Sequence, residues 1–186
     1  AGATDTRGKE IGHGFAERTT FVVTPDGKVA ATIGGIAPAR IFVANEYPGR
    51  DYALVPPRPI ALAAGPARPV LLFLGRLVEV KGVNYLLRAF AVVERRRPDA
   101  ALVIAGDGPQ RAELEALAAD LGIRSVEFIG LVSDPGIKSA LLRRASAMVV
   151  PSVRTRGIAE GGPLVVLEAL SAGLPVIGSD ALGSST

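Results

Sequence analysis

Val70-Leu71-Leu72-Phe73-Leu74, followed directly by Gly75-Arg76, is the stretch that decides the fold. An unbroken apolar run of this length is typical of a strand that is buried on both faces of a parallel sheet. The sequence therefore predicts an α/β fold, a doubly wound parallel sheet with right-handed crossovers. Similar short apolar runs recur further along the chain at 101–105, 126–129, 147–150 and 175–177.

The segments between these runs are expected to form helices. After the first strand, apolar residues recur at helical spacing from Val83 to Val93, and Pro98 ends that helix. A second helix is expected from Pro109 to Gly122, because proline suits the first turn of a helix and glycine its end. Shorter helices are expected over 138–145 and 163–172.

Residues 1–68 do not share this alternation. Within 1–33, two short apolar runs flank the turn Pro25-Asp26-Gly27-Lys28 and predict a β-hairpin. Six prolines between residues 34 and 68 indicate an extended linker. We therefore expect a hairpin appendage over 1–33, a linker over 34–68 and the α/β domain over 69–186.

The composition excludes several classes of protein. Of the 186 residues, 48% are hydrophobic and 21% are charged, as in a globular chain. The absence of cysteine excludes disulfides, thiolate zinc sites and thiol redox chemistry, and with His13 as the single histidine no metal site is expected. The net charge of +3 suits a phosphate-bearing ligand, but nucleic acid is not expected, because no basic run has interleaved aromatic residues.

The ends and the hydropathy of the chain give a further expectation. No apolar stretch reaches the ~18–20 residues of a membrane span, and the start lacks the basic and apolar regions of a signal peptide. We therefore expect a soluble, cytoplasmic protein, with membrane contact only through parts that this sequence lacks. The first residue, Ala1, and the last three, Ser184-Ser185-Thr186, are typical of a fragment.

A second stretch, Glu160-Gly161-Gly162-Pro163-Leu164-Val165-Val166-Leu167-Glu168, predicts a phosphate site. Pro163 suits the first helical position, and the two glycines allow a ligand to approach the backbone closely. The N–H groups of Leu164 to Val166 then point out of the helix start, where the helix dipole favours an anion. Glu160 lies in the loop beside this phosphate, and Glu168 lies about five residues inside the helix, about 7–8 Å from the helix start.

Two acids in one motif also invite a glycosidase interpretation, which their separation excludes. A retaining pair of carboxyls stands about 5–5.5 Å apart and an inverting pair about 6.5–9.5 Å apart. A turn and more than one helical turn separate Glu160 from Glu168. The two acids better suit hydroxyl groups on either side of the phosphate, as in a sugar and a ribose. The simpler alternative is a loop carboxylate and a solvated helix residue.

Two cationic residues, Arg76 and Lys81, follow the first strand, with Gly75 and Gly82 beside them. A guanidinium grips a phosphate with two hydrogen bonds and an ammonium adds a mobile point charge, so the two suit a diphosphate. Taken alone, they are also compatible with ordinary surface charges.

Several motifs keep their order and spacing along the chain. Gly-Arg-Leu and Lys-Gly follow the first strand, Gly-Asp-Gly-Pro the second, Phe-Ile-Gly the third and Pro-Ser the fourth, and the two acids frame the next helix. From about Pro69 to Gly183, this series resembles the nucleotide-binding, Rossmann-like C-terminal half of the GT-B retaining glycosyltransferases. That group includes glycogen synthase, sucrose synthase and mannosyltransferases of cell-envelope assembly.

The resemblance implies a role for each motif. Arg76 and Lys81 hold the diphosphate of a nucleotide-sugar donor. Glu160 binds hydroxyls of the donor sugar, Glu168 binds the ribose, and main-chain groups at Gly130-Leu131 accept the base. The implied reaction moves a sugar from a UDP- or GDP-linked donor to a hydroxyl of a sugar, lipid or other acceptor, with retained configuration and with no metal or other cofactor.

The chain also departs from that group. Its members carry a second, N-terminal Rossmann-like domain that binds the acceptor, whereas residues 1–68 are too short and too unlike it. The last strand and the helices after it are missing as well. Three interpretations stay open: a truncated or rearranged gene, a donor-binding half that works with a separate acceptor domain or subunit, and a non-catalytic nucleotide-sugar-binding module.

Two other families fit less well. Residues 18–32 weakly resemble the hairpin late in the thioredoxin fold of peroxiredoxins, but a chain without cysteine cannot carry out their chemistry. A dinucleotide-binding dehydrogenase has Gly-x-Gly-x-x-Gly after its first strand, and this chain does not.

Overall fold

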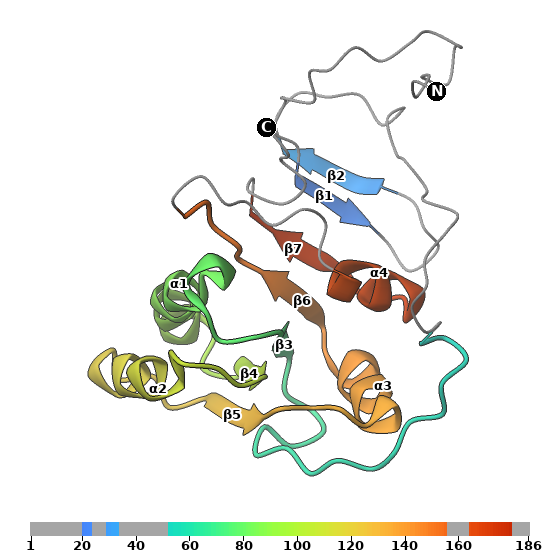
Figure 1. The fold of residues 1–186 in the computed structure, drawn as a ribbon, viewed down its shortest axis with the longest axis horizontal. Helices are drawn as coiled ribbons and strands as arrows, with labels where there is room; N and C mark the ends of the chain where they lie inside the picture. Colours follow the sequence, from blue (N-terminus) through green and yellow to red (C-terminus); the bar gives the residue numbers. More distant parts are fainter. Residues whose placement is uncertain (1–19, 24–28, 34–51, 156–163, 180–186) are drawn as a thin grey trace, which may run out of the picture.

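The computed structural model describes residues 20–23, 29–33, 52–155 and 164–179 (Figure 1). Its strands β5-β4-β3-β6-β7 form, in that order, one sheet in which every pair is parallel. The predicted doubly wound parallel sheet is therefore confirmed. The strands are β3 (Val70–Leu74), β4 (Ala101–Ala105), β5 (Val126–Gly130), β6 (Ala147–Val150) and β7 (Val176–Gly178).

The strands β3 and β4 carry the unbroken apolar runs that a strand covered on both faces needs. They pair in register, from Val70 opposite Ala101 to Leu74 opposite Ala105. Every residue of β4 is buried, as are all but Leu71 in β3. Burial on both sides of the strand requires helices on both faces of the sheet.

Among the described residues, helices cover both faces of the sheet. The helices α1 (Val83–Arg96) and α2 (Arg111–Asp120) lie on one side (Figure 1). The helices α3 (Pro135–Arg144) and α4 (Leu164–Ser171) lie on the other. One turn of 3₁₀ helix, η1 (Glu79–Lys81), precedes α1. The result is a three-layer α/β arrangement.

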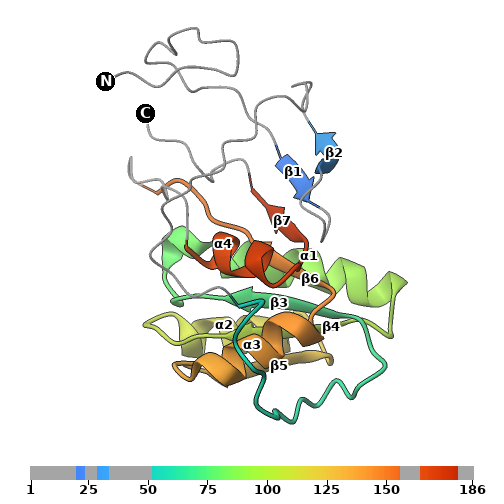
Figure 2. The same cartoon turned by 90° about the vertical axis from the view of Figure 1, so that its right-hand side faces the viewer.

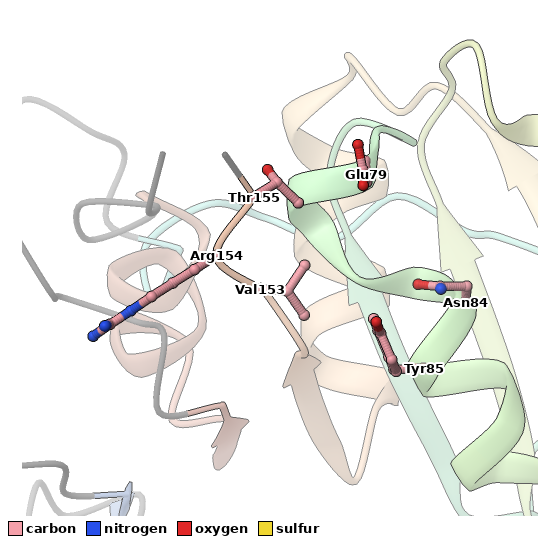
Figure 3. Close-up of a pocket in the computed structure, with 6 residues that line it drawn as sticks. All are labelled: Glu79, Asn84, Tyr85, Val153, Arg154 and Thr155. Atoms are coloured by element: carbon pink, nitrogen blue, oxygen red, sulfur yellow. The ribbon is translucent and has the colours of Figure 1, made fainter. Parts of the chain in front are cut away.

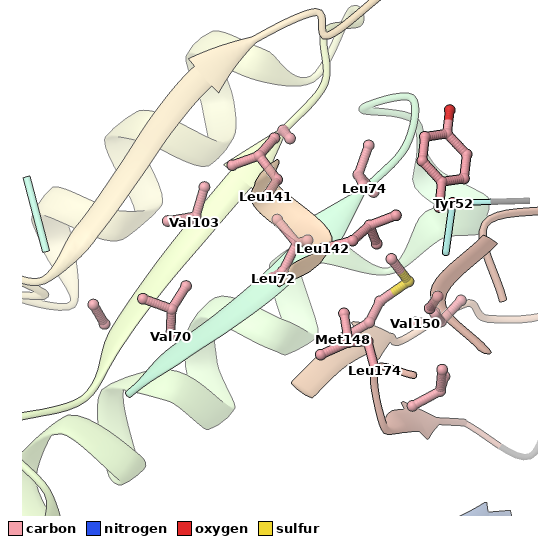
Figure 4. Close-up of a cluster of buried hydrophobic side chains, with 14 of the residues drawn as sticks. Tyr52, Val70, Leu72, Leu74, Val103, Leu141, Leu142, Met148, Val150 and Leu174 are labelled. Atoms are coloured by element: carbon pink, nitrogen blue, oxygen red, sulfur yellow. The ribbon is translucent and has the colours of Figure 1, made fainter. Parts of the chain in front are cut away.

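Each face of the sheet has its own apolar cluster. Phe73 of β3 packs with Ile104 in the cluster under α1 and α2. Its neighbour Leu72 packs on the opposite face with Met148 of β6 and Leu142 of α3 (Figure 4). Successive residues of β3 thus point to opposite faces, as the pleat of a strand requires.

The start of α3 differs from the sequence prediction. The helix begins at Pro135 and not at Lys138. The Asp134 side chain accepts hydrogen bonds from the N–H groups of Gly136 and Ile137 at 2.8 and 3.0 Å. An N-cap aspartate with proline at the first helical position starts a helix, so the predicted start at 138 is wrong.

Two further boundaries move by one or two residues. The helix α2 begins at Arg111 rather than Pro109, because the loop after β3 holds the intervening backbone. The N–H of Gln110 donates to the carbonyl oxygen of Leu77 at 3.2 Å. The strand β7 starts one residue after Pro175, which has no N–H to give to the sheet.

The strands β1 (Thr20–Val23) and β2 (Val29–Ile33) pair antiparallel, which confirms the predicted pair of strands. The turn between them lies outside the described residues. The strand β1 lies alongside β7, although β1 and β2 form a sheet of their own (Figures 1 and 2). The likeness of this pair to a peroxiredoxin hairpin stays a prediction.

Residues 52–68 form no helix or strand, but they are attached to the α3 side of the domain. Tyr52 is buried in the apolar cluster of that face. The N–H of Arg58 donates to the carbonyl oxygen of Gly136 at 3.0 Å. We call this packed segment, 52–68, the strap. The predicted domain boundary near residue 68 stays a prediction, and so does the three-part division of the chain.

Candidate functional site

The strand order reverses between β3 and β6. From β3 the chain proceeds through β4 to β5, then returns beside β3 with β6 and continues to β7. In sheets of this kind, ligands bind beyond the carboxyl ends of the strands at the point of reversal. The loops that follow β3 and β6 therefore flank the candidate site.

The loop after β3, residues 75–82, is held on one side by the loop after β4. The N–H of Leu77 donates to the carbonyl oxygen of Asp107 at 2.9 Å. The two backbones approach so closely that a Cβ on Gly108 would lie 2.4 Å from the carbonyl oxygen of Leu77. Glycine at this position allows the contact, and the contact orders the loop.

The same loop is joined on its other side to the loop after β6. The N–H of Val153 donates to the carbonyl oxygen of Val80 at 2.8 Å. Gly82 has a φ of +64°, and a Cβ there would lie 2.0 Å from the carbonyl oxygen of Pro151. Only glycine suits both this conformation and this contact. The loop is thus held from both sides at the reversal of strand order.

Both predicted cations, Arg76 and Lys81, lie on this loop. Arg76 is exposed and Lys81 is half-buried. The Lys81 side chain runs back along Gly75, where its Cε lies 3.8 Å from the position of an added Cβ. Burial lowers the pKa of the Lys81 ammonium. An ammonium that has lost part of its water gains more from a bound anion than an exposed one does.

A pocket of about 310 Å³ opens between these loops (Figure 3). Arg76 and Lys81 are not among the described residues that line it, so the pocket adjoins the cationic loop rather than enclosing its charges. In Figure 3 the Arg154 side chain points away from those of Asn84 and Tyr85. The lining comes from η1, the start of α1 and the loop after β6: Glu79, Asn84, Tyr85, Val153, Arg154 and Thr155.

Glu168 of α4 is 9% exposed and pairs with Lys138 of α3. The Lys138 ammonium donates to both carboxylate oxygens, at 2.9 and 3.1 Å. The same nitrogen lies 5.4 Å from the centre of the Tyr52 ring. Burial lowers the pKa of Lys138, but the hydrogen bond and charge of Glu168 outweigh burial, so the pKa is raised. The alternative of Glu168 as a solvated helix residue is therefore wrong.

The predicted contact of a nucleotide base, Gly130-Leu131, lies at the carboxyl end of β5, with Gly130 as the last residue of the strand. Gly130 has a φ of +76°, and the Leu131 side chain is exposed. One strand, β4, separates β5 from β3. Two strand spacings amount to about 10 Å, a span that an extended nucleoside diphosphate covers.

The parallel topology brings the described candidates to one edge, because they follow the carboxyl ends of β3, β5 and β6. Glu160, Gly161, Gly162 and Pro163 lie outside the described residues. The role of every candidate stays a prediction. The candidates on the described edge are Gly75, Arg76, Lys81, Gly130, Leu131, Leu164, Val165 and Glu168.

Sequence reasoning missed Lys138. The sequence did contain a signal, because Lys138 stands three and four residues before Leu141 and Leu142, which are both buried. A lysine on the buried face of a helix needs an anionic partner. Only the fold shows that this partner is Glu168. Nothing in the sequence indicated that Tyr52 would be buried beside Lys138, because Tyr52 stands in a proline-rich stretch without periodicity.

Two features are absent from the part of the chain that the structure describes. In residues 20–23, 29–33, 52–155 and 164–179, no group of three His, Cys, Asp or Glu side chains is arranged to hold a metal ion. Within the same ranges, every helix is too short or too polar to cross a membrane. A site that works without a metal stays a prediction.

The fold defines a class of protein, an α/β domain with a doubly wound parallel sheet and a candidate site beyond the carboxyl ends of its strands. The family model described as "Glycosyl transferases group 1" matches residues 61–185, more than half of the chain. The chain belongs to this family of transferases.

Relatives of known sequence agree with this assignment. An uncharacterised glycosyltransferase of Methanocaldococcus jannaschii is 42% identical over 115 residues, which are 61% of this chain and 28% of that protein. A GDP-mannose-dependent alpha-(1-6)-phosphatidylinositol monomannoside mannosyltransferase of Mycolicibacterium smegmatis is 40% identical over 116 residues, 59% of this chain and 29% of that protein. The chain spans less than a third of the length of either relative.

Solved structures share the fold. The structure of WaaG, a glycosyltransferase involved in lipopolysaccharide biosynthesis, matches with a TM-score of 0.53 and 32% identity over 62% of this chain and 30% of that chain. The C-terminal domain of LpcC, a glycosyl transferase group 1 family protein from Francisella tularensis, matches with a TM-score of 0.55 and 23% identity over 70% of each chain. The second likeness shows the fold alone, and the first supports a Rossmann-like glycosyltransferase domain.

Proposed function

We propose that this chain binds a nucleoside-diphosphate sugar at the carboxyl edge of its sheet and forms the donor half of a retaining glycosyltransferase. The observation that carries the proposal is the 2.8 Å hydrogen bond from the N–H of Val153 to the carbonyl oxygen of Val80. It joins the loop of Lys81 to the loop that leads from β6 towards α4, where the strand order reverses. Family membership favours a nucleotide sugar over other anionic ligands.

In this proposal the diphosphate of the donor lies against Arg76 and Lys81. The loop that carries them is held from both sides, so little conformational freedom is lost when the anion binds. Main-chain N–H groups at Leu164 and Val165 add the positive end of the α4 dipole. The sequence Gly161-Gly162-Pro163 before them suits a close approach of the phosphate to the backbone.

The rest of the donor extends along the edge in both directions from the diphosphate. The ribose hydroxyls donate to the Glu168 carboxylate, and the base meets main-chain groups of Gly130-Leu131, where the exposed Leu131 side chain offers apolar surface. On the other side of the diphosphate, Glu160 accepts hydrogen bonds from hydroxyls of the donor sugar.

The proposed reaction breaks the bond between the anomeric carbon and the diphosphate oxygen. A bond forms from the same carbon to the acceptor oxygen, whose proton is released. Negative charge develops on the departing diphosphate, and Arg76, Lys81 and the start of α4 stabilise that charge without a metal. Retention means that the acceptor oxygen takes the face of the sugar that the diphosphate leaves.

The acceptor is a hydroxyl compound, such as a sugar or a lipid, and a separate domain or subunit binds it in this proposal. The Mycolicibacterium relative is named for transfer to a phosphatidylinositol monomannoside and for a GDP-mannose donor. We infer a UDP- or GDP-linked donor for this chain and a cytoplasmic location.

Calorimetry with UDP and GDP in the presence of EDTA tests the proposal. One of the two nucleotides is expected to bind without metal, and its nucleoside, which lacks the charged diphosphate, is expected to bind at least about tenfold more weakly. Absence of binding by both nucleotides would overturn the proposal.

A second measurement separates a transferase half from a binding module that does no chemistry. Labelled UDP- and GDP-sugars are incubated with the chain, and slow release of the sugar is followed by NMR. The anomer that appears first reports whether configuration is retained. Binding without any release of sugar favours the non-catalytic module.

A further inference from the structure

We propose that Lys138 is a positioning residue for the nucleoside: it holds the Glu168 carboxylate in the orientation that accepts the ribose hydroxyls, and Tyr52 of the strap holds Lys138 in turn. This inference rests on the proposed function, in which Glu168 binds ribose. The three side chains come from α3, α4 and the strap, which are far apart in the sequence.

The Lys138 ammonium holds both ends of the carboxylate. Its distances of 2.9 Å to Oε1 and 3.1 Å to Oε2 place it almost symmetrically between the two oxygens. A carboxylate offers about four lone-pair positions, two on each oxygen. With one position on each oxygen occupied by Lys138, one on each remains. The position that remains on each oxygen points outward, away from the ammonium, and is the one to which a ribose hydroxyl would donate.

Burial makes this pairing necessary. The side chains of Lys138 and Glu168 are 19% and 12% exposed. An unpaired carboxylate at such a site takes up a proton or turns towards water, and in either case it is lost as an anionic acceptor. The raised pKa of Lys138 keeps its ammonium charged beside Glu168. Hydrogen bonds to an ionised carboxylate are stronger than those to a neutral group.

Tyr52 attaches the strap to the same turn of α4. Its ring lies 5.4 Å from the Lys138 nitrogen, within reach of a cation–π interaction. Its N–H donates to the Ser171 hydroxyl at 3.1 Å, and that hydroxyl donates to the carbonyl oxygen of Glu168 at 2.8 Å. In Figure 4, Tyr52 stands at the rim of the apolar cluster with its hydroxyl directed away from the other labelled side chains.

The ligand preference of the site separates a positioning role from a purely structural ion pair. An ion pair that only holds α3 to α4 affects the binding of all nucleotides alike. A residue that orients the Glu168 carboxylate affects only nucleotides with ribose hydroxyls. Tyr52 precedes the segment 61–185 that the family model matches, so its contact comes from outside that segment.

The test compares the affinities of UDP and of 2′,3′-dideoxy-UDP, or of the corresponding guanine nucleotides, by calorimetry on the full chain. The original chain is expected to prefer the ribose form by at least about tenfold, as hydrogen bonds to a charged acceptor imply. In Lys138→Met, the preference is expected to fall below about threefold while the dideoxy form keeps its affinity. Lys138→Arg retains the positive charge and is expected to retain part of the preference.

Two controls show whether the effect acts through Glu168. Arg58→Met removes the exposed ion pair between Arg58 and Asp134 at the start of α3, 2.6 Å long, and is expected to leave the preference unchanged. In a Glu168→Gln background, Lys138→Met is expected to cause no further loss of preference, because the carboxylate that it orients is gone.

The outcomes are distinguishable. If neither UDP nor GDP binds the original chain, the proposed function fails. If a nucleotide binds but the original chain shows no preference for ribose, or if Lys138→Met keeps the full preference, this inference alone is overturned. Should Lys138→Met not fold, Lys138→Gln takes its place: its side chain is one bond shorter than that of lysine and carries no charge, so a full ribose preference in this variant overturns the inference.

Discussion

Gly82 and the carbonyl oxygen of Pro151 are in such close contact that a Cβ on Gly82 would lie 2.0 Å from that oxygen. Gly82 is also the N-cap of α1 and has a φ of +64°. One residue therefore joins the loop after β3, the loop after β6 and the start of a helix. Any side chain at this position must move at least one of the three.

Gly82→Ala is expected to lower the free energy of unfolding by about 2 kcal/mol or more, since backbone strain and the displacement of Pro151 add. Gly65→Ala is the matched control. Gly65 has the same φ of +64° but nothing within 4 Å of an added Cβ, so its variant carries only the strain, about 1 kcal/mol. Urea denaturation measures both. Equal losses in the two variants would contradict the steric explanation.

Arg76→Ala and Lys81→Ala are each expected to weaken nucleoside-diphosphate binding by about 10- to 100-fold, because each removes a charge-assisted hydrogen bond to the diphosphate. Arg88→Ala is the control, since Arg88 is exposed on α1 away from the loop after β3. Calorimetry with UDP or GDP measures all three. If Arg76→Ala and Lys81→Ala both bind the nucleotide as tightly as the original chain, this loop is not the diphosphate site.

Nucleotide affinity is expected to fall as the pH becomes alkaline, at a lower pH than that at which an exposed lysine loses its proton. Burial lowers the pKa of Lys81 below 10.5, so its ammonium is lost as pH rises through that lower value, and the attraction to the diphosphate goes with it. Stability changes in the opposite sense. The free-energy cost of burying the Lys81 charge is fully present at pH values below the pKa of Lys81 in the folded chain. This cost disappears as the pH rises to the pKa of the same group in the unfolded chain, so the free energy of unfolding increases over that range. Lys81→Met is expected to remove both dependences.

Asp134→Ala is expected to destabilise α3, because its carboxylate caps the helix by accepting from Gly136 and Ile137. The N–H of Ile137, with Arg58 and Gly136, holds the pKa of Asp134 below its ordinary 3.8. The contribution of the charge is therefore present above 3.8 and is lost as pH falls through the folded pKa. Thermal unfolding from neutral to acid pH measures it. Asp134→Asn keeps a capping oxygen and is expected to lose much less stability than Asp134→Ala. Equal losses of stability in the two variants would contradict the capping role of Asp134.

The strap is expected to contribute to the stability of the domain. A chain that starts at residue 69 lacks the buried Tyr52 and the hydrogen bond from Arg58 to Gly136. Compared with a chain that starts at residue 52, its free energy of unfolding is expected to be lower by at least about 3 kcal/mol, as for removal of one large buried aromatic side chain. Denaturant unfolding of the two chains measures the difference. Equal stability would support a domain boundary at residue 68.

The strands could be predicted almost to the residue, because runs such as 70–74 and 101–105 are apolar throughout and are followed directly by glycine. The predicted start of α3 is three residues too late, although its signal, Asp134-Pro135, is local. The partner of Glu168 could not be predicted. Lys138 stands 30 residues away in the sequence, and only the packing of α3 against α4 brings the two together.

Tyr52 attaches the strap to the Ser171 hydroxyl of α4 and to the Lys138 ammonium of α3. A pull on the chain at residue 52 therefore acts first on these two contacts. In the proposed arrangement they also set the orientation of Glu168, so mechanical load and nucleotide occupancy are linked. Load that loosens Tyr52 favours release of the nucleotide, and by reciprocity a bound nucleotide strengthens the anchor against that load.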